Sequence, residues 1–386
     1  MRLFVASDLH LDEAGGARLF RDERQGRALG DLVERVLDAD AELVLDGDTL
    51  DLTATEAPPH GLEAFARAVG MTLPPPPKRT PAERARAIAR DNPHAVAALA
   101  RAAARGALTL VHGNHDRHLN EPGGEAILEA AGLGEAALAP VVVRALAGKK
   151  ALVAHGHAWD PGNATPDGGG EALTQALHHA VVPFLLEHGS RHNVRMDVDR
   201  VVALRPEESV IAVFERWLTP DDFDRFFRAF LKLLGANGVV PRAASLLARF
   251  LSPETMRRRV EKADALWERS GRAALHALAS HRPLPGGPRD ADVLVLGHTH
   301  VLDWAVQDGP RGEQLYVNLG TWTERAFDGS SPSDRTLPVL EVDDEDGELR
   351  ARLFDLQDPD VTLQRFGGDA DRRAPPVDGD AAPLSS

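Results

Sequence analysis

The chain has 386 residues, of which 43% are hydrophobic and 27% are charged, and its formal net charge is −15. This composition is that of a globular protein that can bury one large core or two, and its acidic balance argues against a nucleic-acid partner, whose phosphates need clustered Lys and Arg. The absence of cysteine excludes disulfides and thiolate metal sites, and no apolar stretch approaches the roughly 20 residues of a membrane span, so we expect a cytoplasmic protein.

The first part of the chain alternates strand-like and helix-like segments. Short apolar runs predict strands at residues 2–7, 41–48, 107–114 and 150–157. Periodic patterns between them predict helices at 26–39 and 80–106, the second of which should break at Pro93. The first run passes directly into polar residues, which favours a strand over a signal peptide. This alternation predicts an α/β fold.

The strand pattern disappears in the middle of the chain. Residues 171–290 predict amphipathic helices, and strands return at 292–300, 315–322, 337–344 and 348–356, the last two as a hairpin. We therefore expect a discontinuous domain organisation, with a core of residues 1–170 and 291–360, a helical insertion or cap of residues 171–290, and a disordered acidic tail of residues 361–386.

Unusual polar side chains follow five of the predicted strands. They are Asp8 and His10 in "SDLH", Asp48 in "GDTLD", Asn114, His115 and Asp116 in "GNHD", His155 and His157 in "HGH", and His298 and His300 in "GHTH". Ligands of open α/β sheets bind at the carboxyl ends of the strands. Five such ends of similar chemistry therefore predict one shared site.

The donor types at these strand ends indicate metal binding. Carboxylates, imidazoles and an amide oxygen, without sulfur, suit Mn²⁺, Fe²⁺ or Zn²⁺. There are enough donors for two ions, and an isolated Asp48 after Gly47 is a candidate bridging ligand. A glycine stands directly before three of these polar groups, at Gly47, Gly113 and Gly297. Glycine at these positions indicates close approach of the backbone or unusual φ angles.

The five motifs, in this order, resemble those of the calcineurin-like metallophosphoesterase superfamily, across residues 3–155 and 292–325. The resemblance implies a four-layer α/β/β/α sandwich with two divalent metal ions, Mn²⁺ first among them, at one end of its sheets. It implies Asp8, His10 and His300 on one ion and Asp48 as the bridge. It also implies Asn114, His155 and His298 on the other ion.

The same resemblance assigns the chemistry. His115 would contact the phosphate and protonate the leaving oxygen, and Asp116 would orient His115. The reaction expected is hydrolysis of a phosphate monoester, diester or pyrophosphate through a two-metal-activated hydroxide. His157 is either a further substrate contact or a turn histidine. Asp46 and Asp51 are expected to support the ligands or cap backbone, and His112 to pack.

Departures from individual subfamilies narrow the substrate. Asp51 stands where purple acid phosphatases have a tyrosine, and "GNHD" differs from the "GNHE" of protein Ser/Thr phosphatases. The position of the insertion resembles UDP-2,3-diacylglucosamine hydrolases, although His115 and His157 replace the Arg and Asp of their "GNRD" and "HGD" motifs. DNA exonucleases of the SbcD type share "GNHD" but carry their extra domain after the last motif. An exonuclease stays an alternative.

The insertion is the candidate specificity element. Residues 195–290 carry more Lys and Arg than Asp and Glu, and Arg257 and Arg258 are candidate substrate contacts, with a solvated helix face as the alternative. Its Phe-rich helices either pack as a core or bind an apolar group. We expect a nucleotide- or lipid-linked phosphorylated substrate, with peripheral membrane contact through the cap. A non-catalytic scaffold on the same fold is the alternative from another class.

Overall fold

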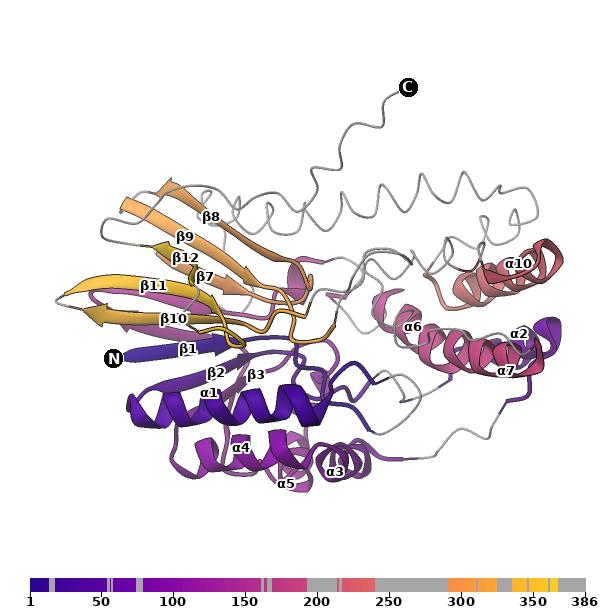
Figure 1. Cartoon of the computed structure of the whole chain (residues 1–386), viewed down its shortest axis with the longest axis horizontal. Helices are drawn as coiled ribbons and strands as arrows, with labels where there is room; N and C mark the ends of the chain where they lie inside the picture. Colours follow the sequence, from indigo (N-terminus) through magenta and orange to yellow (C-terminus); the bar gives the residue numbers. More distant parts are fainter. Residues whose placement is uncertain are drawn as a thin grey trace.

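The computed structural model shows a mixed α/β protein with two multi-stranded sheets (Figure 1). It describes residues 1–13, 18–53, 56, 58–73, 79–160, 163–164, 169–192, 214, 217–239, 291–309, 312–324, 335–345, 347–359 and 362–366. No helix within these ranges is long and apolar enough to cross a bilayer.

The larger sheet has seven strands in the order β12-β11-β10-β1-β2-β3-β4. These are β1 (Arg2–Ala6), β2 (Glu42–Asp46), β3 (Leu108–Val111), β4 (Ala137–Ala139), β10 (Pro338–Glu345), β11 (Glu348–Asp355) and β12 (Thr362–Phe366). Neighbours from β1 to β4 are parallel, so the carboxyl ends of β1, β2 and β3 lie at one edge. β10 and β11 form the predicted hairpin.

The smaller sheet has five strands in the order β5-β6-β7-β9-β8. These are β5 (Val142–Leu146), β6 (Lys149–Val153), β7 (Val293–Leu296), β8 (Leu302–Gly309) and β9 (Gly312–Leu319). β6, β7 and β9 are parallel, which again brings the carboxyl ends of consecutive strands together.

Alternation along the strands builds the layers. Leu3 and Val5 of β1 pack between the two sheets, whereas Phe4 and Ala6 face the helices, as the period of two in a strand requires. In Figure 1 these helices lie below the larger sheet. They are α1 (Arg27–Asp38), α3 (Pro81–Asp91), α4 (Pro93–Ala104) and α5 (Gly124–Ala130). The described residues thus show helix, sheet and sheet, and the expected fourth layer stays a prediction.

The break predicted at Pro93 is confirmed. α3 begins with a capping box between Thr80 and Glu83 and ends at Asp91, with Asn92 as its C-cap. α4 begins at Pro93, where a missing N–H is tolerated. The Asn92 side chain is buried and donates to the carbonyls of Ile88 (2.8 Å) and Asp12 (2.7 Å). The corner between the two helices is therefore fixed by hydrogen bonds.

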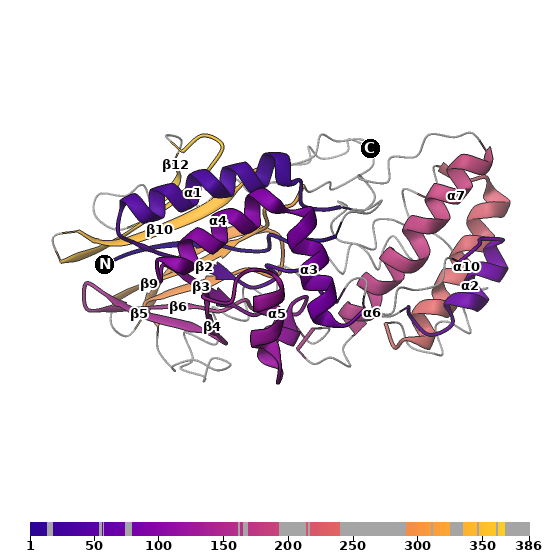
Figure 2. The same ribbon diagram turned by 90° about the horizontal axis from the view of Figure 1, so that it is seen from below.

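A second hydrophobic core lies at one end of the molecule, away from the sheets (Figure 2). It joins α6 (Gly169–Ala176), the π-helix η4 (Leu177–Val181), α7 (Val182–His192) and α10 (Pro220–Ala236) with α2 (Leu62–Val69). Phe226 contacts Phe65 edge-on and stacks on Phe230, with ring centroids 5.7 and 5.4 Å apart. These phenylalanines pack as a core, one of the two readings of the sequence pattern.

Two predicted boundaries are wrong. α2 falls within the segment 1–170 that we assigned to the core, yet its buried face packs against α10 and η4, in the segment that we assigned to the insertion. Residues 362–366 fall within the predicted disordered tail, yet they form β12, which pairs with β11. Both errors have the same cause. The position of each short segment depends on contacts with residues far away in the sequence or on strand pairing, which local sequence patterns do not show.

Candidate metal centre

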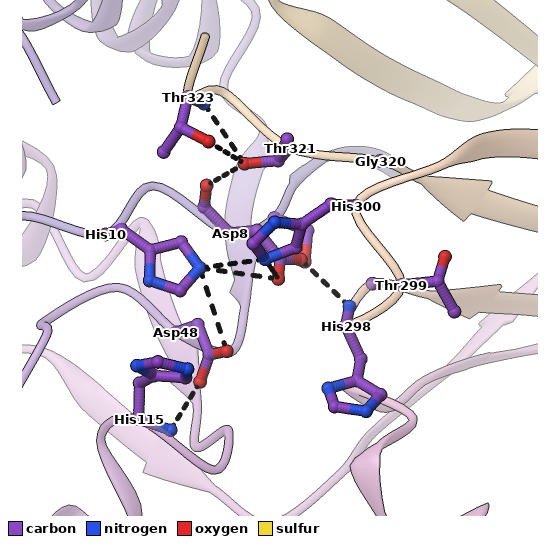
Figure 3. A network of polar contacts seen from close by, with 12 residues as sticks. Asp8, His10, Asp48, His115, His298, Thr299, His300, Gly320, Thr321 and Thr323 are labelled. Atoms are coloured by element: carbon purple, nitrogen blue, oxygen red, sulfur yellow. Dashed lines mark hydrogen bonds and ion pairs between the residues drawn. The ribbon is translucent and has the colours of Figure 1, made fainter. Parts of the chain in front are cut away.

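The five polar strand ends meet at one place in the fold. Asp8 and His10 follow β1, Asp48 follows β2, and His298 and His300 follow β7, and all five are buried. Figure 3 shows the side chains of Asp8, His10, Asp48 and His300 converging, with His115 beside Asp48 and His298 joined to Asp8 through its backbone N–H. Asn114 and His155 arrive from the ends of β3 and β6. The structure therefore brings all seven predicted metal ligands to one site.

Most of these residues have a left-handed backbone. Among the described residues, the non-glycine residues with positive φ are Asp8, His10, Asp40, Asp48, Ala147, His298 and His300. Five of the seven are predicted ligands, with φ between 48° and 70°. Such a conformation costs about 1–3 kcal/mol per residue and persists only where surrounding contacts impose it. The clustering of strain supports a functional site, and no residue type at these five positions predicts a left-handed backbone.

Hydrogen bonds impose this backbone shape. The carbonyl of Asp8 accepts from Thr321 Oγ1 at 2.8 Å and from the N–H of Trp322 at 3.2 Å. The N–H of His10 donates to the carbonyl of Asp48 at 2.8 Å. The loops after β1 and β2 are thereby locked to each other and to the segment after β9.

Glycines make room for the side chains, as expected from the sequence. A Cβ at Gly113 would overlap the carboxylate of Asp48, and one at Gly297 would overlap the side chains of Ser7 and Asp8. Gly47 combines a positive φ of 79° with close approach of the His155 ring. No side chain fits at these three positions while the site keeps its shape.

The first cluster contains Asp8, His10, Asp48 and His300, whose donor atoms all lie within 4.8 Å of one another. Nε2 of His300 lies 3.1 Å from Oδ1 of Asp8 and 3.0 Å from Nε2 of His10. Oδ1 of Asp8 is buried and accepts no well-directed hydrogen bond within the described part of the chain. A buried carboxylate oxygen facing two imidazole nitrogens is the arrangement that a cation would complete.

The second cluster contains Asp48, His155 and His298, again within 4.8 Å. Nδ1 of His155 donates to the carbonyl of Asp46 at 2.8 Å, which leaves Nε2 as the nitrogen that faces Oδ2 of Asp48 at 3.1 Å. Oδ1 of Asn114 lies 3.3 Å from the same Nε2. Asp46 therefore supports a ligand, as one reading of the sequence expected.

Asp48 belongs to both clusters. Its Oδ1 accepts the N–H of His115 at 2.8 Å, and its Oδ2 lies 3.1 Å from His155 Nε2 and 3.9 Å from His10 Nε2. The backbone bond fixes the carboxylate so that one oxygen points between the two groups of imidazoles. This is the position that a bridging ligand requires.

The electrostatics of the site agree with this packing. Burial raises the pKa of a carboxyl group, yet the surrounding histidines, His155 foremost, together outweigh burial and hold the pKa values of Asp8 and Asp48 well below their usual range. Burial lowers the pKa of His155, but the charges of Asp48 and Asp8 raise it well above its usual value. Buried ionised carboxylates are stabilised by a nearby positive charge. Oxygen and imidazole donors without sulfur fit Mn²⁺, Fe²⁺ or Zn²⁺.

His115 lies at the rim of the first cluster. Its Nδ1 lies 3.0 Å from Oδ1 of Asp51, its ring packs edge-on against His10 at 4.7 Å, and its side chain is 14% exposed. Burial lowers its pKa, but Asp51 and Asp48 outweigh burial and raise it. With Nδ1 held by Asp51, Nε2 is the nitrogen left for a substrate.

The expected partner of His115 was wrong. Asp116 does not orient it: the Asp116 carboxylate instead accepts the backbone N–H groups of Gly113 (2.6 Å), Thr49 (2.8 Å) and Leu50 (3.3 Å). Burial and the charge of Asp48 raise the pKa of Asp116 to about 6. Asp116 ties two loops together, and Asp51 is the carboxylate at His115. The sequence signal for Asp51 was the second Asp of "GDTLD".

The remaining candidates differ in what the structure says of them. His157 lies beside the second cluster, 5.5 Å from the His155 ring, and burial together with that ring lowers its pKa to about 3. His112 stacks edge-on against His157 at 5.8 Å. A substrate contact by His157 stays a prediction. Arg257 and Arg258 lie outside the described residues.

No protein-family model and no curated protein matches this chain. A solved structure of a conserved uncharacterized protein from Streptococcus pneumoniae TIGR4, described as a predicted phosphoesterase, matches with a TM-score of 0.31 and 10% identity. That match covers 95% of this chain and 97% of the other. A TM-score of this size does not show a shared fold, so function is inferred from the site itself.

Proposed function

We propose that this protein is a metal-dependent phosphoesterase with two divalent ions at the site. The observation that carries this proposal is the position of Asp48, whose carboxylate belongs to both buried clusters. Asp8, His10 and His300 would complete one ion's ligand set, and Asn114, His155 and His298 the other's. Mn²⁺ is the first choice, because oxygen and imidazole donors suit it and sulfur is absent.

The bound ions would supply an activated water and neutralise the phosphate oxygens. The protein's own part begins with the fixed ligands. Asp48 is held by the His115 N–H, and His155 is held by the Asp46 carbonyl, so neither side chain has to reorganise when substrate binds. Pre-set ligands of this kind favour a single geometry of the reacting phosphate.

His115 is the proposed proton donor to the leaving oxygen. Asp51 holds its Nδ1, which directs Nε2 outward, and its partial exposure gives a substrate access. The neighbouring Asp51 and Asp48 raise the pKa of His115, which favours the imidazolium form that can give a proton to an alkoxide. His157, on the side of the second cluster, is a candidate further contact.

The helical insertion is the proposed specificity element. Its first helix, α6, is tied to the loop that carries His115: Arg117 donates to the two carboxylate oxygens of Glu171, both at 3.1 Å. The substrate class we propose is a nucleotide- or lipid-linked monoester, diester or pyrophosphate. DNA exonuclease activity and a non-catalytic scaffold on the same fold are the alternatives that the test must separate.

The test is an activity panel with metal-loaded protein. It compares aryl mono- and diesters, a cyclic nucleotide, a UDP-linked lipid and single-stranded DNA with Mn²⁺. We expect hydrolysis of at least one ester or pyrophosphate, lost in Asp48→Asn together with bound metal. Asp40→Asn is the matched control, because Asp40 is also an aspartate with left-handed φ but lies between α1 and β2. Full metal binding and activity in Asp48→Asn would overturn the proposal.

A further inference from the structure

Two side chains that follow β6 in the chain lie beside the second cluster: Asp160 contacts His298, and Asn163 contacts Asn114. Neither belongs to the strand-end motifs, and the proposed function does not use them. We propose that Asp160 and Asn163 are positioning residues that set the orientation of His298 and Asn114 toward the second ion. This inference rests on the proposed two-ion centre.

Asp160 acts on His298. Its Oδ2 lies 3.0 Å from Nε2 of His298. An ionised carboxylate only accepts hydrogen bonds, so Nε2 carries the proton and Nδ1 is the unprotonated nitrogen of the neutral ring. Histidines that bind metal characteristically donate their other N–H to such an acceptor, which fixes the tautomer and the ring orientation. Asp160 therefore selects Nδ1 of His298 as the metal-binding nitrogen.

Asn163 acts on both Asp160 and Asn114. Its Nδ2 donates to Oδ2 of Asp160 at 2.6 Å, and its Oδ1 lies 3.5 Å from Nδ2 of Asn114. An amide binds a cation through its oxygen, so Asn114 must turn its nitrogen away from the ion. Asn163 accepts a hydrogen bond from Nδ2 of Asn114 and so holds this nitrogen away from the ion. Oδ1 of Asn114 then lies 3.3 Å from Nε2 of His155.

Backbone hydrogen bonds and α6 hold Asp160 and Asn163 in place. The carbonyl of Asp160 accepts the N–H groups of Asn163 (2.9 Å) and Ala164 (2.8 Å). Gly170, at the start of α6, packs so closely that a Cβ there would overlap the amide of Asn163. The first helix of the insertion therefore touches the residue that orients Asn114, one contact away from the second ion.

The test measures metal binding rather than turnover. Metal-free full-length protein is titrated with Mn²⁺ and followed by calorimetry and electron paramagnetic resonance. We expect two ions in the wild type and, in Asp160→Ala, one of the two bound about 10–100-fold more weakly while the other is unchanged. Asp160→Asn keeps a neutral acceptor for Nε2–H, so it should restore part of the loss.

The control is Asp344→Ala. Asp344 also closes a turn with its carboxylate, accepting the N–H groups of Ala147 and Gly347 at 3.0 Å each, but it lies at the β10–β11 hairpin. The Asp344→Ala variant should bind both ions with the affinities of the wild type. Pulsed measurements on the Mn²⁺-loaded protein should show fewer coupled histidine nitrogens in Asp160→Ala, because His298 is no longer aimed at the ion.

The outcomes separate the two proposals. Two ions of unchanged affinity in Asp160→Ala overturn the positioning role and leave the proposed function intact. A wild-type protein that binds fewer than two ions overturns the two-ion centre, and this inference with it. Weakening of both ions in Asp160→Ala, together with a lower Tm of the metal-free protein, shows damage to the fold and also overturns the positioning role.

Discussion

Oδ1 of Asp51 lies 3.0 Å from Nδ1 of His115, and its other carboxylate oxygen lies 3.5 Å from Nδ1 of His10. One buried carboxylate thus faces both the proposed proton donor and a proposed ligand of the first ion. The charge of His115 and its hydrogen bond, with those of His10, outweigh burial and hold the pKa of Asp51 well below its usual range. Asp51 is positioned to set two imidazole orientations at once.

Replacing Asp51 with Asn should therefore lower kcat about 10–100-fold and weaken binding of the first ion, because His115 loses its charged acceptor and His10 loses the carboxylate charge 3.5 Å away. The second ion should bind as in the wild type. Steady-state kinetics and Mn²⁺ titration check this. Asp116→Asn is the comparison, because Asp116 accepts three backbone N–H groups. This variant should have a lower Tm and a kcat close to that of the wild type. The reverse pattern would return the orienting role to Asp116.

His115→Ala should retain both ions and lose rate, because His115 contributes its backbone N–H, not its ring, to the Asp48 carboxylate. The loss should be about 10²–10⁴-fold for alkyl esters, whose leaving oxygen needs a proton, and much smaller for nitrophenyl esters. Parallel kinetics on the two ester types provide the measurement. Equal losses on both would exclude His115 as the acid.

Gly113→Ala should disrupt the site, because the added Cβ would overlap the Asp48 carboxylate. We expect weaker metal binding and a loss of about 1–3 kcal/mol in the free energy of unfolding, in the range of overpacked buried sites. Gly30→Ala is the control. Gly30 lies within α1 with open space around its Cβ position, so alanine there should stabilise by about 0.5–1 kcal/mol. Urea unfolding of both variants checks the contrast.

Stability should depend on pH through His118. Nε2 of His118 lies 3.0 Å from the Glu56 carboxylate, and Nδ1 lies 2.8 Å from the Glu121 carboxylate. The hydrogen bond to Glu56 is the main cause that raises the pKa of His118. A raised histidine pKa contributes stability that is fully present below the unfolded pKa, near 6.5, and lost as pH rises through the folded pKa. His118→Gln should thus destabilise by about 1 kcal/mol at pH 5.5 and by much less at pH 9. Denaturant unfolding at the two pH values measures this. An equal effect at both would exclude the charged pair.

Much of the fold and site was predictable because the signals are local. Strand runs and helix starts follow from period and capping, as at Pro93, and donor types such as those of Asp8 and His155 are read directly from the sequence. Parallel strands then place their carboxyl ends together without further information. The seven predicted ligands are together for this reason.

The misassignments involve contacts that local sequence does not encode. Asp51 and Asp116 are both plausible carboxylates near His115, and only the turn geometry directs Asp116 to backbone N–H groups. α2 is an ordinary amphipathic segment whose partner, α10, lies about 150 residues further along the chain. Asp160 carried no motif, and its role follows from a contact with His298 across the site.

The left-handed backbone of the five ligands has an evolutionary consequence. At Asp8, His10, Asp48, His298 and His300 a glycine would adopt the observed φ without strain. Selection of random variants for thermal stability alone, with metal withheld, should therefore enrich glycine and asparagine at these positions and erase the site. Their occupation by Asp and His marks places where selection for chemistry has outweighed selection for a relaxed chain.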